Sequence, residues 1–160
     1  MLQVRLAQLS DAPELKKLND LFNGEDSNTV EAIKKSLGEN SQEIVCVVCE
    51  NNGKTEKVTG FCCGQIINSM CYSISYGDIT EFFVTDKYQQ QGVGKQLVAF
   101  IEIEFSKRGV NHLHHYTGKN NTAMQELYHS MGYLDSTKNS YKSSSMIILE
   151  KDTDINPNKF

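Results

Sequence analysis

The sequence lacks a long apolar run and a cluster of basic residues. No apolar run approaches the ~18 residues of a membrane span, and the N-terminus, Met-Leu-Gln-Val-Arg, has no basic region followed by an apolar stretch. No run of Lys and Arg has the length of a nucleic-acid footprint, and the 160 residues carry a formal net charge of −4. We therefore expect a cytoplasmic protein with no membrane and no nucleic-acid partner, whose acidic charge suits a cationic ligand.

The spacing of the cysteines does not suit a metal site either. Five cysteines form an odd set, and Cys46, Cys49, Cys62 and Cys63 fall in strand-like apolar runs. On a strand, residues that are adjacent or three apart point to opposite faces, so neither pair converges on a zinc ion. We expect reduced, buried thiols and no bound metal.

The hydrophobic pattern predicts one mixed α/β domain over residues 1–150 and a flexible tail over residues 151–160. The expected elements are a strand near Val4 to Leu6, a helix opening at Ser10 or Asp11, a helix from about Thr29 to Gly38, strands over 44–50, 58–69 and 72–85, a helix from Val93 to Gly109, a strand over 110–117, a helix from Asn120 or Asn121, and a hairpin over 133–150. The Asn-Gly pair between the second and third strands favours a tight hairpin turn.

The most informative segment runs from Gln89 to Gly94 and reads Gln-Gln-Gln-Gly-Val-Gly. It lies between the strand-like run from Ile79 to Thr85 and an amphipathic helical run. Its two glycines let a ligand approach the backbone, and the amides that open the helix point at a bound phosphate. A Walker loop would need Lys and then Ser or Thr after its second glycine, whereas Lys95 is followed by Gln96. The dinucleotide fingerprint would need a third glycine, so the segment predicts another phosphorylated cofactor.

The segment from Glu81 to Leu97 resembles the acetyl-CoA signature of the GNAT N-acetyltransferase superfamily, which reads Gln or Arg, two residues, Gly, one residue, and Gly or Ala. Gln89, Gly92 and Gly94 fill this pattern. The same stretch also resembles that of aminoglycoside 3-N-acetyltransferases, in the small-molecule branch of the family.

A second resemblance lies about thirty residues further on. The stretch from Asn121 to Tyr133 is similar to the family's second signature, with Asn, then Leu-Tyr128, then Gly132 and an aromatic residue, although Met124 stands where the family usually has Ala. Two signatures in the right order and at the right separation are more specific than either alone. The resemblance extends from Met1 to about Glu150.

The resemblance implies a GNAT acyl-CoA N-acyltransferase fold, of element order βααβββαβαββ, whose mixed sheet splays at the cofactor site. It implies an enzyme that uses acetyl-CoA, without a metal, to acetylate a primary amine by direct attack. The expected acceptor is a small cationic molecule, such as an aminoglycoside or a polyamine. A protein lysine or an N-terminal amine is an alternative acceptor, and a non-catalytic acyl-CoA sensor is an alternative function. A homodimer is possible, since many relatives dimerise.

The resemblance also assigns residues to the cofactor. The pyrophosphate is expected on the loop and the start of the helix, over Gln89, Gln90, Gln91, Gly92, Val93, Gly94 and Lys95. The backbone of Phe83, Val84 and Thr85 is expected beside the pantetheine arm, with the Val84 amide at the thioester oxygen. Asn121 either binds the cofactor or caps its helix, since both roles need a short polar side chain.

Acetyl transfer needs a proton for the departing thiolate and a base for the amine. Tyr128, which also borders the expected cofactor site, is the candidate acid because it matches the family's Leu-Tyr position. Glu81 is the favoured base and Asp78 the alternative. In a regular strand these two carboxylates face opposite sides, so only one enters the site unless a bulge intervenes.

Four residues are expected to contact the acceptor. Glu25 and Asp26, in the loop between the first two helices, carry charge that would steer a cation, and Glu81 would face the amine. His115 is the fourth candidate, as a base or a substrate contact. His114 and His115 are adjacent on a strand and point apart, which argues against a metal held by both.

Overall fold

A computed structural model of the chain describes residues 1–153 except 54, 72 and 137–145. The strands are β1 (Leu2–Leu6), β2 (Glu43–Asn51), β3 (Glu56–Ile67), β4 (Tyr76–Val84), β5 (His112–Gly118), β6 (Leu134–Asp135) and β7 (Met146–Asp152), and the helices are α1 (Ala12–Asn23), α2 (Val30–Glu39), α3 (Val93–Lys107) and α4 (Thr122–Ser130). The order β1, α1, α2, β2, β3, β4, α3, β5, α4, β6, β7 confirms the predicted βααβββαβαββ sequence of elements. Short 3-10 turns precede α1 and follow β4.

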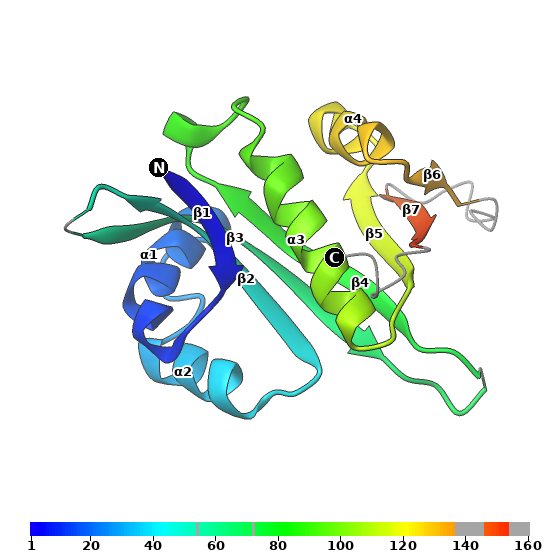
Figure 1. The fold of residues 1–160 in the computed structure, drawn as a ribbon, viewed down its shortest axis with the longest axis horizontal. Coiled ribbons are helices and arrows are strands. Elements are labelled where there is room, and N and C mark those ends of the chain that lie inside the picture. The colour runs from blue at the N-terminus through cyan, green and yellow to red at the C-terminus, as the bar shows by residue number, and fades with distance from the viewer. Residues whose placement is uncertain (54, 72, 137–145, 154–160) are drawn as a thin grey trace.

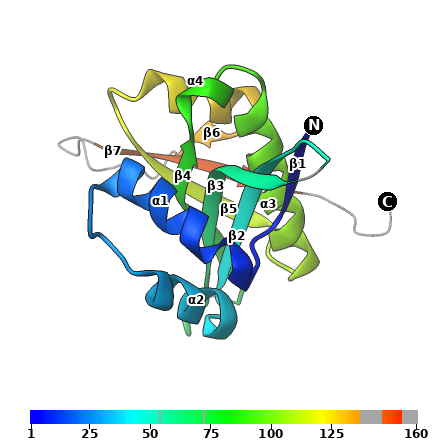
Figure 2. The same cartoon turned by 90° about the vertical axis from the view of Figure 1, so that its left-hand side faces the viewer.

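The strands form one seven-stranded sheet with the spatial order β1-β2-β3-β4-β5-β7-β6. Helices α1 and α2 lie on one face and α3 on the other (Figures 1 and 2). Leu15 and Leu18 of α1 pack on β2 and β3 with Phe61. On the opposite face, Leu97 and Phe105 of α3 pack with residues of β2 to β5 and α4. Each face therefore has its own apolar core, as the separate helical stripes in the sequence require.

The sheet forks between β4 and β5, the one parallel pair among its neighbouring strands. The pairing starts at Tyr76 with His112 and ends at Ile79 with His115. Beyond that point β4 continues to Val84 on β3, whereas β5 continues to Gly118 on β7. The predicted splay is thus confirmed, and it opens at the end of β4 that leads into the glycine loop.

A β-bulge at Thr80 interrupts β4 just beyond the fork. Cys63 of β3 pairs with Glu81, but its successor Gly64 pairs with Ile79, so Thr80 is the extra residue. One extra residue reverses the alternation of side chains along a strand. Asp78 and Glu81 therefore point to the same face of the sheet, the face of α1 and α2, which corrects the expectation for a regular strand.

Several sequence-based boundaries differ from the structure, and two of them concern the ends of α2 and β7. Helix α2 begins after Thr29, whose hydroxyl caps Ala32 N at 3.1 Å, but it continues through Glu39 rather than ending at Gly38. Strand β7 continues through Asp152, so the start of the expected tail lies in the sheet. Residues 154–160 of that tail, and most of the turn of the closing hairpin, fall outside the described residues.

In the described part of the chain, no helix is long and apolar enough to cross a membrane. The β3–β4 hairpin projects from the body of the molecule (Figure 1). Met70 and Ile74, near its turn, are exposed.

Candidate active site

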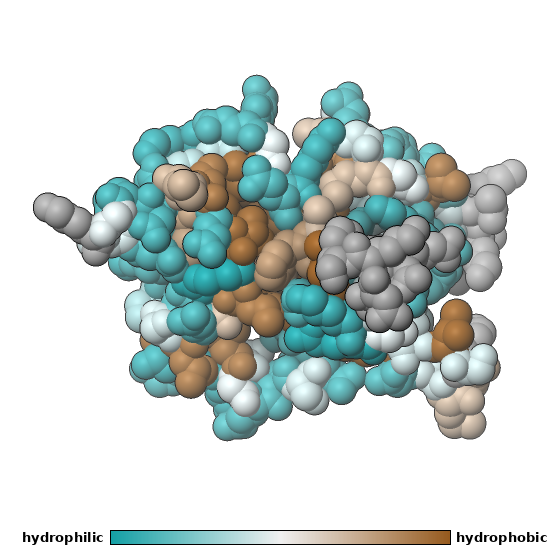
Figure 3. All heavy atoms as spheres, in the orientation of Figure 1, coloured by the Kyte–Doolittle hydropathy of each residue, from teal (hydrophilic) through white to brown (hydrophobic). Residues whose placement is uncertain are grey.

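A cleft of about 520 Å³ opens at the fork of the sheet, and we call it the fork cleft. It is lined by Phe82, Phe83, Val84, Gln89, Gln90, Gly92, Gly94, Lys95, Asn121, Ala123, Met124 and Leu127. The molecular surface is hollowed between the loop that precedes α3 and helix α4 (Figure 3). The cleft thus brings together both of the sequence segments that carry the family resemblance.

The loop before α3 holds its backbone in an uncommon conformation. Gln90 and Gly92 have φ angles of +57° and +77°, in the left-handed region. The loop is tied down by its own side chains, because Gln89 Nε2 donates to Val84 O at 2.8 Å and Gln91 Nε2 donates to Lys87 O at 2.7 Å. The side chains of these glutamines therefore shape the loop, and its backbone is left to meet a ligand.

Helix α3 presents an open N-terminus to the fork cleft. Gly92 is the N-cap, no side chain caps the first turn, and that turn holds no acidic residue. The first N–H groups of a 15-residue helix thus remain available for an anion, with the cation of Lys95 beside them. Val93 is different from its neighbours because its side chain is buried in the core and does not line the cleft.

Whether a phosphorylated ligand fits the fork cleft depends on the room left at Gly94. A Cβ atom at this position would lie 3.0 Å from Phe82 Cζ and 3.4 Å from Leu127 Cδ2, inside the cleft. A side chain here would have to displace Phe82 or Leu127, so glycine keeps this narrow part of the cleft open while the backbone lies alongside it. The residues present therefore fit the pyrophosphate and pantetheine of coenzyme A, and the N-terminus of α3 is where the pyrophosphate would bind.

The end of β4 offers a backbone edge to the same cleft. Thr85 N and Thr85 Oγ1 both donate to Thr59 O at 3.0 Å, so the Thr85 amide is committed to β3. By strand alternation the N–H and C=O of Val84 point away from β3 and toward the fork, where Gln89 meets the carbonyl. Of the three residues expected along the pantetheine arm, Val84 is the one whose amide faces the fork.

Asn121 caps α4 and borders the fork cleft, and its contact with the cofactor stays a prediction. Its Oδ1 accepts from Met124 N at 3.3 Å as the N-cap of α4, and the residue also lines the fork cleft. Phe82, Ala123, Met124 and Leu127 line the cleft but were not predicted from the sequence. Their positions in the two signature segments were the available signal, because both segments converge on the fork.

Tyr128 lies on the buried side of α4. Its side chain is 0% exposed, and its hydroxyl has no hydrogen-bond partner among the described residues. Its ring stacks on His115, with centroids 4.1 Å apart and planes at 18°, and meets Tyr133 edge-on at 4.8 Å. Burial raises the pKa of Tyr128 well above its usual value, so the phenol carries its proton at neutral pH.

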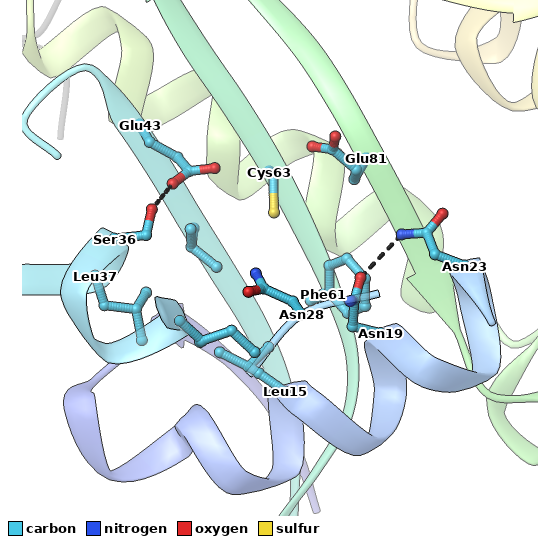
Figure 4. A pocket seen from close by; sticks show the side chains of 12 residues that line it. Leu15, Asn19, Asn23, Asn28, Ser36, Leu37, Glu43, Phe61, Cys63 and Glu81 are labelled. Carbon is cyan, nitrogen blue, oxygen red and sulfur yellow. Dashed lines mark hydrogen bonds between the residues drawn. The ribbon is translucent and has the colours of Figure 1, made fainter. Parts of the chain in front are cut away.

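On the other face of the sheet lies a pocket of about 200 Å³, which we call the helix-side pocket (Figure 4). Its lining comes from five elements and one loop and comprises Leu15, Asn19, Asn23, Asn28, Ile33, Ser36, Leu37, Glu43, Val45, Phe61, Cys63 and Glu81. Asn23 donates to Asn19 at 2.9 Å, and Ser36 donates to Glu43. Of the residues predicted for the site, Glu81 alone lines this pocket.

Asp78 and Glu81 form a coupled pair of carboxylates beside the fork. Burial, with the nearby charge of Glu81, raises the pKa of Asp78 to about 6. Asp78 Oδ1 is buried and has no hydrogen-bond partner among the described atoms, whereas Glu81 accepts from the hydroxyl of Thr80. The pair can therefore hold a proton near neutral pH, as a base for an ammonium group must.

The structure does not bring the remaining predicted acceptor residues into this pocket. Glu25 and Asp26 are exposed in the α1–α2 loop and line no part of it. His115 is buried and faces α4, on the opposite face of β5 from His114. Within the described ranges, no group of three or more His, Cys, Asp or Glu side chains is arranged to hold a metal ion.

Comparison with known proteins agrees with this geometry. The chain matches the sequence model of the acetyltransferase (GNAT) family over residues 12–133. No curated protein matches it. Among solved structures, the PaiA N-acetyltransferase of Thermoplasma acidophilum, in complex with coenzyme A, is 15% identical and has a TM-score of 0.68, covering 96% of this chain and 99% of that chain.

Two further solved structures share the fold. The ribosomal-protein-S18-alanine N-acetyltransferase of Escherichia coli is 22% identical with a TM-score of 0.68, over 95% of this chain and 94% of that one. An aminoglycoside acetyltransferase from an uncultured soil metagenomic sample is 19% identical with a TM-score of 0.67, over 81% and 86%. These two proteins differ in the kind of acceptor that their names state.

A forked mixed sheet with an uncapped helix N-terminus in the fork defines the class of acyl-CoA-dependent acyltransferases. Within that class, the chain belongs to the acetyltransferase (GNAT) family. It is an N-acetyltransferase, and acetyl-CoA is its co-substrate.

Proposed function

We propose that this N-acetyltransferase acetylates the primary amine of a small cationic acceptor that enters through the helix-side pocket. The observation that carries the proposal is the bulge at Thr80. It turns Asp78 and Glu81 to the face that holds the pocket, at the point where the fork admits the co-substrate from the other face. A small, partly enclosed volume of about 200 Å³ with carboxylates at its wall suits a compact amine.

Acetyl-CoA supplies the activated acetyl group, and the residues of the chain supply positioning and proton transfer. The amide of Val84 is the backbone donor that we assign to the thioester oxygen, because it points into the fork. Glu81 attracts the ammonium form of the acceptor and is our first choice of base. Asp78, whose raised pKa makes it a better proton acceptor than an ordinary carboxylate, is the second.

Tyr128 is the proposed acid for the departing thiolate. Burial keeps the phenol protonated, and its hydroxyl is not occupied by any described partner. We assign no covalent role to the cysteines. Burial raises the pKa of Cys46 and Cys49 to about 12 and those of Cys62 and Cys63 well above the usual value, so these thiols are not nucleophiles at neutral pH.

The direct experiment is a thiol-release assay with acetyl-CoA and a panel of diamines, polyamines, aminoglycosides and peptide N-terminal amines. We expect release with the small cationic amines and a loss in kcat of about 10²-fold in Tyr128→Phe, since general-acid contributions are of that size. Thermal stabilisation by acetyl-CoA without release from any amine would instead support a sensor. Unchanged kcat in both Tyr128→Phe and Glu81→Gln would overturn the assigned roles.

A second candidate acceptor is the N-terminal amine or a lysine of a polypeptide. One observation favours it: α1 and α2 pack over β2 and β3, and no described helix covers the same face of β5 and β7. Tyr116, on that open face, is 44% exposed beside Asp78. Preference for peptides over every small amine in the same assay would select this candidate. The expected cytoplasmic location, homodimer and lack of nucleic-acid and membrane partners stay predictions.

A further inference from the structure

His115 makes two specific contacts from a fully enclosed position. The residue is 5% exposed, and its Nδ1 lies 2.9 Å from the carbonyl oxygen of Ile79. A carbonyl can only accept, so Nδ1 carries the hydrogen and donates it. Burial lowers the pKa of His115, so the imidazole is neutral and its Nε2 has no proton. The second contact is the stack on Tyr128 described above.

The first contact lies at the apex of the fork. Ile79 and His115 are the last residues that pair between β4 and β5, and the bulge at Thr80 follows immediately. The side chain of one member of that last pair therefore bonds to the carbonyl of the other. Such a bond holds the two strands together at the point where the main-chain pairing stops.

The second contact, the stack on His115, orients the ring of Tyr128. No described atom hydrogen-bonds to the Tyr128 hydroxyl, so rings set the orientation of the phenol. His115 lies flat against one face at 4.1 Å, and Tyr133 meets the ring edge-on. A stacked pair of this kind restricts tilt and rotation of the phenol, which an acid needs in order to meet a developing charge.

We propose that His115 is a positioning residue that acts through both contacts: it pins the apex of the fork through Ile79 and holds the ring of Tyr128 for proton delivery. The second half rests on the proposed role of Tyr128, whereas the first half concerns only the binding of the co-substrate. The two halves can be separated, because different substitutions preserve different contacts.

Two variants divide the roles. His115→Asn places an amide nitrogen near the position of Nδ1 and can still donate to Ile79, but it removes the stacked ring. His115→Phe keeps a ring against Tyr128 and removes the donor. Calorimetry with acetyl-CoA and steady-state kinetics are measured on both, with thermal unfolding and circular dichroism to compare their folds.

The expected results cross over. His115→Asn should lower kcat about tenfold with less than about a threefold change in the Kd for acetyl-CoA. His115→Phe should raise that Kd about tenfold with a smaller loss in kcat, of about threefold. In a Tyr128→Phe background, His115→Asn should add little further loss in kcat, because the two residues act as a unit. Nitrogen NMR of the wild-type chain should find Nδ1 protonated and Nε2 bare.

Two results would overturn the proposal. One is a parallel loss in both variants, in which kcat and Kd change in proportion to thermal stability, as for an ordinary core residue. The other is a protonated Nε2 with a bare Nδ1, which would exclude the bond to Ile79 even if neither variant folds. If the wild-type chain released no thiol with any amine, the proposed function would fail, yet the Kd comparison and the NMR result would still decide the first half.

Discussion

The fork cleft and the helix-side pocket lie against the same strand, β4, but they are built in opposite ways. All twelve residues that line the fork cleft come from two short segments, 82–95 and 121–127, and the cleft presents backbone amides and glycines to a ligand. The helix-side pocket draws side chains from α1, the α1–α2 loop, α2, β2, β3 and β4, which are spread along the sequence from Leu15 to Glu81. The fork cleft is therefore encoded by two local sequence segments, whereas the helix-side pocket forms only when the tertiary fold brings distant residues together.

The two sites should respond differently to substitutions. A backbone site tolerates many side chains but few changes of conformation, so substitutions at its glycines should have large effects. A side-chain site is sensitive to the size and charge of each lining residue, but each contributes only part of the binding energy.

The largest effect is expected at Gly94. In Gly94→Leu, the new side chain enters the space between Phe82 and Leu127, so the cleft loses the room for its ligand. We expect the Kd for acetyl-CoA to rise at least about 100-fold, or about 2.7 kcal/mol. Gly38→Leu is the matched control, because Gly38 is an exposed helical glycine with a single ordinary contact. Equal Kd values for the two variants would show that the backbone site is elsewhere.

The next effect concerns the carboxylate pair. In Glu81→Gln the charge that helps to raise the pKa of Asp78 is gone, so that pKa should fall below its value of about 6. If Asp78 is the base, the acidic limb of the pH–kcat profile moves to lower pH and the plateau falls by about tenfold or less. If Glu81 is the base, Glu81→Gln loses about 100-fold or more and Asp78→Asn keeps most of the rate. An unmoved limb with an unchanged plateau would remove both carboxylates from the mechanism.

Asp78 also gives a prediction for stability. Its pKa is about 6 in the folded protein and 3.8 ordinarily, so the folded state binds the proton more tightly. Stability therefore falls as pH rises from about 4 to about 6, and the cost is fully present at pH 7. Asp78→Asn should raise the free energy of unfolding at pH 7 by about 1 kcal/mol, a value reduced for partial exposure to solvent. Urea unfolding at pH 4 and pH 7 measures it, and the gain should vanish at pH 4.

The same contrast explains what the sequence could predict. Hydrophobic periodicity predicts the order of elements, and a local motif predicts the loop from Gln89 to Gly94. The fork was expected only because the chain resembles the GNAT family. The bulge at Thr80 could not be predicted, because an extra residue in a strand leaves no compositional mark, and it decides where Asp78 and Glu81 point. The helix-side pocket could not be predicted from the sequence either, because Asn19 of α1 meets elements there that are far away in the sequence.

For His115 and Asn121 the sequence narrowed the possible positions or roles but did not decide between them. The adjacency of His114 and His115 correctly implied that they face apart, but not which of them faces the open side of the sheet. That choice follows from the packing of α4, which buries His115 against Tyr128. For Asn121 the sequence left two roles open. The structure shows the helix cap, at the N-terminus of α4 that borders the fork cleft, and the cofactor contact stays a prediction.

A tenfold effect is expected from filling the helix-side pocket. Cys63 lines this pocket next to Glu81, and its side chain is small. In Cys63→Leu the added volume should raise the KM for a small cationic amine about tenfold, with little change in the Kd for acetyl-CoA. Cys71→Leu, at an exposed cysteine in the β3–β4 hairpin, is the matched control. A KM unaltered by Cys63→Leu would place the acceptor on the open face of β5 and β7 instead.

The smallest effect is expected from the loop carboxylates. Glu25 and Asp26 are exposed and outside the helix-side pocket, and charges in water are screened over about 8 Å at physiological ionic strength. In the double variant Glu25→Gln with Asp26→Asn, the KM for a cationic amine should therefore change by less than about twofold at 0.15 M salt. The measurement is repeated at 0.01 M salt, where long-range steering would be strongest. A tenfold rise in KM at the higher salt would mean that this loop closes over the acceptor, so that the side-chain site extends beyond the pocket that α1 and α2 form with the sheet.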